Sequence, residues 1–191
     1  MVEVKNFIDI KNRYEFRSWL EKNSEIKTEC WIYVKKGCPK NNNFFWYIDA
    51  VEEALCFGWI DSIHKNVEGL GHVQKFGPRR KNSQWSELNK ERCRRLEKLN
   101  LMTSNGRKKF LEAKEFYLDD EILNLLKKTP DAWQNFIKFP DLYQRVRIDT
   151  IQREKNRQRK IYEYALKKFI DNTKRGIMFG EWNDYGRLLN Y

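Results

Sequence analysis

The chain lacks the features that mark membrane, secreted or nucleotide-binding proteins. No apolar run approaches the roughly 20 residues of a membrane-spanning helix, and the start of the chain has no signal-peptide pattern. The four cysteines show no C-x-x-C spacing, and a chain of this size does not need disulfides. No P-loop or G-x-G-x-x-G pattern is present. We therefore expect a soluble cytoplasmic protein with free thiols and no cofactor.

Acidic residues are outnumbered, with 27 Asp and Glu against 38 Lys and Arg, and the net charge is +11 at pH 7. The excess is uneven along the chain. Residues 1–75 hold 11 basic and 11 acidic side chains, residues 76–118 hold 12 against 5, and residues 119–191 hold 15 against 11. The positive potential therefore begins after residue 75. Such a charge favours anionic partners but says nothing about the fold.

The apolar periodicity predicts an α+β protein that is mostly helical, with a small antiparallel β-sheet in the N-terminal half. Helical spacing covers residues 12–23, and Asp49 is a candidate cap for a helix over 50–57, with Glu52 and Glu53 in its first turn. β-rich alternation covers residues 28–36. Two further strands, 59–65 and 72–76, flank a turn signal at 68–71 and predict a hairpin.

After Pro78 the pattern becomes helical. Ser83 or Ser86 is a candidate cap for the first helix, Thr103 for the second, and Asp131 starts a short third one. One long helix is expected from 141 to about 172. We expect one domain, 1–191, made of a mixed part at 1–77, a basic helical part at 78–176 and a tail at 177–191.

The densest group of chemically useful side chains lies between residues 59 and 86. Arg79 and Arg80 follow a proline and precede a helix start, so guanidinium and backbone N–H groups can converge on one anion. A structural corner is the alternative, in which arginine stacks on tryptophan, serine caps the helix and Asp61 pairs with an arginine. The candidate ligand-binding residues are Trp59, Asp61, Arg79, Arg80, Ser83, Trp85 and Ser86.

Asp61, His64, Glu68 and His72 have side chains of the kinds that bind metals. Strand alternation places Asp61 and His64 on opposite faces, so we expect no metal site here. An enzyme that uses Asp61 and His64 together with the two arginines is a further alternative, with Asp61 orienting His64 as a general base. No nucleophile elbow accompanies them, and the catalytic residues stay unassigned.

Nonspecific nucleic-acid binding is the other use of a basic surface. The stretch 152–160 has no apolar residue, which indicates a helix face that meets solvent or a charged partner. The chain has no RNP-like motif, G-x-x-G loop or zinc-finger spacing, so such binding would be nonspecific. The residues that would neutralise phosphates are Arg153, Lys155, Arg157, Arg159 and Lys160.

Four segments carry a resemblance to a known family: ALCFGWIDSI, FGPRRKNSQWSELNKERCRRL, LMTSNG and NRQRKI. In this order and spacing, from about residue 16 to 176, the chain resembles the YdeI/OmpD-associated family, also labelled bacteriocin-protection proteins. The resemblance implies a cytosolic, mostly helical protein with a small sheet, associated with envelope stress and without an agreed biochemical activity. The chain departs from the family where an acidic residue and threonine are expected, because Lys155 and Asn156 precede Arg157.

These observations together predict a cytosolic stress-type protein that binds a small anionic or polar ligand at the GWID and PRRKNSQWS segments. Nonspecific nucleic-acid binding and an enzyme are the alternatives. The sequence leaves open the identity of the ligand and the oligomeric state.

Overall fold

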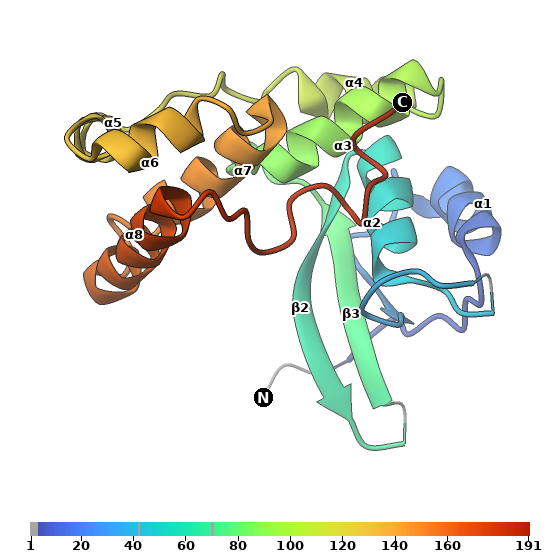
Figure 1. The fold of residues 1–191 in the computed structure, drawn as a ribbon. Helices are drawn as coiled ribbons and strands as arrows, with labels where there is room; N and C mark the ends of the chain where they lie inside the picture. The colour runs from blue at the N-terminus through green and yellow to red at the C-terminus, as the bar shows by residue number, and fades with distance from the viewer. Residues whose placement is uncertain (1–3, 42, 70) are drawn as a thin grey trace. The chain divides into compact units, whose positions relative to one another are not determined.

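The computed structural model describes residues 4–41, 43–69 and 71–191, which form eight α-helices and one three-stranded antiparallel sheet (Figure 1). This confirms the predicted α+β class, with the sheet in the N-terminal half. The chain divides into two compact units. The first comprises the chain up to Gln84, together with Arg92–Ala113 and Tyr191; the second comprises Trp85–Glu91 and Lys114–Asn190. The prediction of one domain over 1–191 stays a prediction.

The sheet of the first unit consists of β1 (Cys30–Tyr33), β2 (Trp59–Val67) and β3 (Gly71–Pro78), in the order β1-β3-β2. The predicted hairpin is confirmed, because β2 pairs with β3 in antiparallel register from Trp59 opposite Pro78 to Val67 opposite Gly71. Its turn signal includes Leu70, which lies outside the described residues.

Strand β1 is shorter than the predicted segment 28–36. After Tyr33 the backbone pairs elsewhere: the N–H of Lys35 donates to the carbonyl oxygen of Phe45 at 2.9 Å, and Lys35 forms an isolated bridge with Trp46. The end of the predicted strand therefore connects the sheet to the segment before the next helix.

Helices α1 (Arg13–Asn23) and α2 (Tyr47–Cys56) lie beside the sheet in the first unit (Figure 1). Asn12 caps α1 by accepting from two backbone N–H groups of the first turn. The predicted cap of α2 was wrong: Trp46 occupies the N-cap position, and Asp49 lies inside the first turn. Most of α2 is buried, including the charged residues Glu52 and Glu53.

The core of the first unit forms where α1 meets the sheet. Phe16 of α1 and Phe76 of β3 are both fully buried, with ring centroids 5.4 Å apart in an edge-to-face contact. Cys30 pairs with Phe76 across the sheet, and Ile32 pairs with Gln74. Helix α1 therefore covers this face of the sheet at Phe76.

Helices α3 (Glu87–Lys98) and α4 (Ser104–Phe110) follow the sheet. The first turn of α3 belongs to the second unit and the rest to the first. Ser86 accepts from the backbone N–H of Asn89 at 3.2 Å, so Ser86 is the cap of α3. The predicted cap at Thr103 is also confirmed, since its hydroxyl accepts from the N–H of Gly106 at 3.2 Å.

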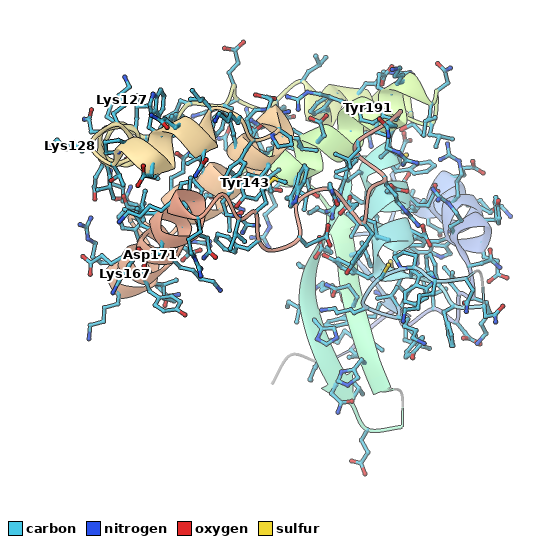
Figure 2. All side chains as sticks on the ribbon, viewed as in Figure 1. Lys127, Lys128, Tyr143, Lys167, Asp171 and Tyr191 are labelled. Atoms are coloured by element: carbon cyan, nitrogen blue, oxygen red, sulfur yellow. The ribbon has the colours of Figure 1, made fainter. Side chains whose placement is uncertain are left out.

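The second unit contains α5 (Asp120–Lys127), α6 (Pro130–Phe136), α7 (Asp141–Gln152) and α8 (Arg159–Lys174). Helix α5 was not predicted, whereas α6 has the predicted Asp131 in its first turn. Figure 2 shows the labelled side chains of Lys127 on α5 and Lys167 on α8 extending away from the ribbon. The buried core of this unit comprises Ile122, Leu126, Ala132, Phe136, Tyr143, Ile148, Ile151, Tyr162, Leu166, Phe169 and Ile170.

The prediction of one long helix from 141 to about 172 was wrong. Helix α7 ends at Gln152, turns follow, and α8 begins at Arg159. The interruption falls on the stretch without apolar residues, which has no face to bury against the core. Among the described residues, no helix is long and apolar enough to span a membrane.

Candidate functional site

Arg79 lies at the end of the hairpin and holds a turn from inside. Arg79 is only 5% exposed. Its Nη1 donates hydrogen bonds to the Oγ of Ser83 and to the carbonyl oxygen of Gln84, both at 3.0 Å. Its backbone N–H donates to the carbonyl oxygen of Gly58 at 2.9 Å. Arg79 thus ties the chain after β3 to the residue before β2.

The segment between these contacts forms a tight basic turn. The N–H of Ser83 donates to the carbonyl oxygen of Arg80 at 3.2 Å, and Asn82 adopts a left-handed conformation with φ of 62°. Arg80, Lys81 and Asn82 are exposed, whereas Ser83 is half-buried. Arg80 and Lys81 are therefore exposed on this turn, whereas the buried Arg79 makes hydrogen bonds inside it. We call residues 79–83 the arginine turn.

Burial disfavours the positive charge of Arg79. Burial lowers the pKa of Arg79 to about 10, and the neighbouring Cys93, Asp61 and Glu112 raise it only in part. A buried cation whose surroundings disfavour its charge is stabilised by added negative charge. Asp61 is itself held in place, because its Oδ2 accepts from the hydroxyl of Tyr47 at 2.7 Å.

The other predicted ligand-binding residues are placed differently. Trp59 is 1% exposed, its Nε1–H donates to the carbonyl oxygen of Ser24 at 3.1 Å, and its ring packs edge-on against Trp19. Trp59 is therefore part of the core. Trp85 is buried, and it belongs with Ser86 to the second unit. Of the predicted set, Arg79, Arg80 and Ser83 lie in one turn, and Asp61 is near enough for its charge to raise the pKa of Arg79.

A β-bulge changes the prediction for Asp61 and His64. Asp61 lies opposite Phe76 and His64 lies opposite Gln74, with a register shift between them. Residues 74 and 76 are two apart on β3, and cross-strand partners share a face, so Asp61 and His64 project from the same face of the sheet. The prediction of opposite faces was wrong because three steps along β2 match two along β3. Gln74 holds the bulge by donating to the carbonyl oxygen of Ile63 at 3.1 Å.

Asp61 and His64 nevertheless have different partners. Asp61 accepts from Tyr47, whereas the ring of His64 stacks on that of His72, with centroids 5.2 Å apart and planes 6° from parallel. Desolvation, the charge of Lys36 and the charge of His72 lower the pKa of His64. The contacts of His64 therefore do not favour an Asp61–His64 acid–base pair. Within the described ranges, no group of three or more His, Cys, Asp or Glu residues gathers to hold a metal.

The basic run predicted for nucleic acid is engaged within the second unit. The Nζ of Lys155 lies 2.8 Å from the Oδ2 of Asp119 and 3.1 Å from the Oε2 of Glu121. The hydrogen bond to Asp119 is the largest effect that raises the pKa of Lys155. Further ion pairs join Arg153 to Asp149 at 3.3 Å, Arg157 to Glu154 at 3.8 Å and Arg159 to Glu163 at 2.8 Å, and Lys160 is exposed. This pairing leaves less positive charge for phosphates than the sequence indicated.

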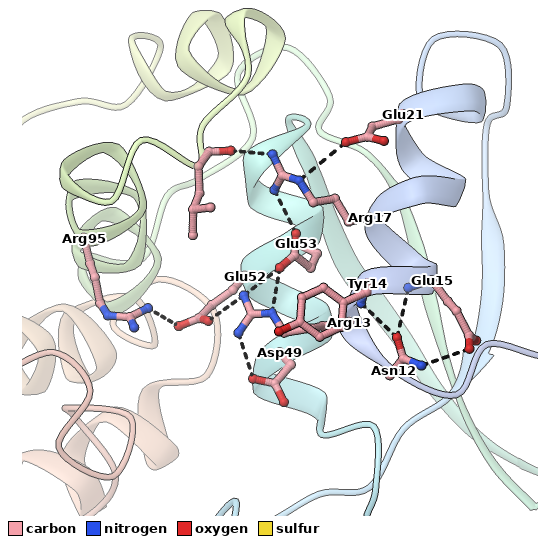
Figure 3. A network of polar contacts seen from close by, with 11 residues as sticks. Asn12, Arg13, Tyr14, Glu15, Arg17, Glu21, Asp49, Glu52, Glu53 and Arg95 are labelled. Carbon is pink, nitrogen blue, oxygen red and sulfur yellow. Dashed lines mark hydrogen bonds and ion pairs between the residues drawn. The ribbon is translucent and has the colours of Figure 1, made fainter. Parts of the chain in front are cut away.

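Sequence reasoning missed a buried ion network in the first unit (Figure 3). Glu53 accepts from Arg13 at 2.6 Å and from Arg17 at 3.0 Å, and Glu52 accepts from Arg95 at 2.8 Å. The side chains of Glu52 and Glu53 are 1% and 4% exposed. Their predicted first-turn position was wrong, because the earlier start of α2 places them in mid-helix. The sequence did offer a signal for this network, because Glu52 and Glu53 lie on a helix whose other residues are mostly apolar, and buried acidic residues need charged partners.

A groove of about 260 Å³ also lies in the second unit, between α5 and α8. Its lining includes the apolar Leu125, Leu166 and Ile170 and the acidic Glu163 and Asp171. None of the predicted ligand-binding residues lines it.

The LMTSNG segment, residues 101–106, joins the start of α4 to the end of α2. The hydroxyl and the N–H of Thr103 both donate to the carbonyl oxygen of Cys56, at 2.7 and 3.0 Å. Gly106 packs directly on that same carbonyl group. The segment therefore clamps the start of α4 to the end of α2.

The fold and these contacts define a small α+β domain in which a helix-covered three-stranded sheet presents a basic turn. A family model described as "Domain of unknown function (DUF8412)" matches residues 8–109, which is more than half of the chain. The chain belongs to this family. The match covers the hairpin, the arginine turn and the LMTSNG clamp. No curated protein and no solved structure matched the chain. The resemblance to the YdeI/OmpD-associated family stays a prediction.

Proposed function

We propose that this protein binds a small anionic ligand, a carboxylate or a phosphate, at the arginine turn. The observation that carries the proposal is the position of Arg79, which is buried behind the turn with a pKa lowered to about 10 by desolvation. Arg80 and Lys81 are exposed on the outer side of the same turn. An anion that docks there meets two exposed cations, and its charge offsets part of the cost of burying Arg79 behind them.

The residues have distinct roles in this proposal. Arg80 and Lys81 contact the ligand, because their side chains are exposed. Ser83 and Arg79 hold the turn in shape through their 3.0 Å hydrogen bond. The negative charge of Asp61 partly offsets the lowering of the Arg79 pKa by burial. The resemblance to the YdeI/OmpD-associated family supports a role for such binding in a cytosolic stress or bacteriocin-protection response.

Calorimetric titration with inorganic phosphate and with succinate tests the proposal. We expect Arg80→Gln to weaken binding about tenfold, since a charge-assisted hydrogen bond contributes about 1.5–3 kcal/mol. Lys22→Gln is the matched control, because it removes the same charge from an exposed position of α1. The control should bind as the unmodified protein does.

Two results would overturn the proposal. One is that neither anion binds, and the other is that Arg80→Gln and Lys22→Gln have equal effects. Native mass spectrometry before and after nuclease treatment tests the nucleic-acid alternative independently. Copurified oligonucleotide that dissociates at high salt would favour that alternative.

A further inference from the structure

We propose that His64 and His72 form a binding site for a divalent transition-metal ion, independently of the arginine turn. The sequence contains two histidines in 191 residues, and the structure places them in contact. They come from the adjacent strands β2 and β3. His64 lies opposite Gln74, and His72 is two residues before Gln74, so both rings project from the same face of the hairpin.

The distance between the rings fits shared coordination. A metal–nitrogen bond of about 2.0–2.1 Å places a bound ion about 3.2 Å from the centre of each imidazole ring. Two such rings at a tetrahedral angle have centres about 5.2 Å apart. The observed separation of the His64 and His72 centroids is 5.2 Å.

The orientation of the rings requires one adjustment. The planes are 6° from parallel, and two stacked planes cannot both contain the same ion. The rings must therefore turn about the Cβ–Cγ bond, which is a soft torsion in histidine. Both side chains are exposed, so neighbouring groups leave room for this rotation. The hairpin ladder keeps the two strands in register meanwhile.

The surroundings define the kind of ion. Imidazole nitrogens are common ligands of divalent transition metals. No third His, Cys, Asp or Glu joins the pair within the described ranges. Water must then complete the coordination, as suits an exchangeable Ni²⁺ or Zn²⁺ ion held by two nitrogens. The charge of Lys36, which contributes to the pKa shift of His64, opposes the cation.

Titration calorimetry of the full-length protein without an affinity tag tests this site, with Ni²⁺ as the probe. We expect one Ni²⁺ per chain and an affinity at least tenfold lower in His64→Gln and in His72→Gln. Asn66→Ala is the matched control, because residue 66 is an exposed neighbour on β2. Lys36→Gln should strengthen binding.

The same measurement contains the outcomes that overturn the inference. No Ni²⁺ binding by the unmodified protein would do so, as would unchanged affinity in either histidine variant. A second variant, Cys38→Ser, removes the exposed thiol, which is another possible ligand for the probe. Loss of binding in Cys38→Ser would assign the ion to the thiol and refute the histidine site. Circular dichroism confirms that each variant is folded.

Discussion

The substitution Gly106→Ala tests how closely helices α2 and α4 must approach. A Cβ at residue 106 would lie 2.1 Å from the carbonyl oxygen of Cys56, 2.7 Å from its carbonyl carbon and 3.0 Å from the carbonyl oxygen of Leu55. Real Cβ contacts are essentially never shorter than 3.0 Å. Helix α4 would therefore have to move by about 1 Å, since the obstacle is backbone.

The cost of this movement can be estimated from the contacts that it strains. Overpacking costs about 1–3 kcal/mol. The two hydrogen bonds from Thr103 to Cys56 are each worth about 1 kcal/mol, and both lengthen when α4 moves. Alanine recovers about 1 kcal/mol through its higher helix propensity. We expect a net loss of about 3 kcal/mol and a fall in Tm of about 5–10 °C.

Urea unfolding followed by far-ultraviolet circular dichroism measures the effect, with the midpoint compared at constant slope. The matched control is Ser104→Ala, because Ser104 is exposed on the same helix and its replacement should change stability by less than about 0.5 kcal/mol. If Gly106→Ala were as stable as the unmodified protein, helix propensity would outweigh the contact and the reasoning would be refuted.

Four further predictions concern charged and titratable groups. Glu53→Gln should destabilise the protein by about 1.5–3 kcal/mol in urea unfolding, because it removes the carboxylate that Arg13 and Arg17 share and leaves them their longer contacts with Asp49, Glu52 and Glu21; an unchanged midpoint would contradict this. His72→Gln should raise the pKa of His64 measured by NMR, because the charge of His72 contributes to its lowering after desolvation and Lys36; an unmoved pKa would contradict the stacked contact. Because the pKa of His64 is lower in the folded state than in the unfolded state, its protonation at low pH favours unfolding. The fall in stability as the pH drops through the range of histidine titration should therefore be smaller in His64→Gln. A thiol reagent at neutral pH should modify Cys38 rapidly and the three buried cysteines only on unfolding, since desolvation raises the pKa of each buried thiol to about 12; fast modification of a second thiol would contradict their burial.

The local elements of this protein were predictable because their signals are local. Thr103 caps α4 as the sequence predicts, helical spacing over residues 12–23 matches α1, and the alternation around the turn at 68–71 produces the expected hairpin. Helix α5 was missed although Asp119 caps it, because its eight residues offer few turns of periodicity. The cap of α2 was misplaced because Asp49 suits both an N-cap and a first turn.

The candidate site was predictable only in part. The cluster of basic residues after Pro78 is visible in the sequence, and so is the choice between an anion site and a structural corner. The structure shows the structural role, since Arg79 braces the turn through Ser83 and Gln84 while Arg80 is exposed; the anion site stays a prediction. Trp59 was placed in the site because tryptophan is a common pocket wall, yet it fills the core.

The basic excess, the hairpin, helix α1 and the Thr103 cap could be predicted from the sequence, because propensity, periodicity and side-chain capping act over a few residues. Three other features depend on distant partners and follow from tertiary contacts. The bulge that puts Asp61 and His64 on one face requires the register with β3, and the break before α8 coincides with the ion pairs of Lys155 to residues more than thirty positions earlier. The need for glycine at 106 arises from the carbonyl of Cys56. Such contacts are set by packing, which no local pattern encodes.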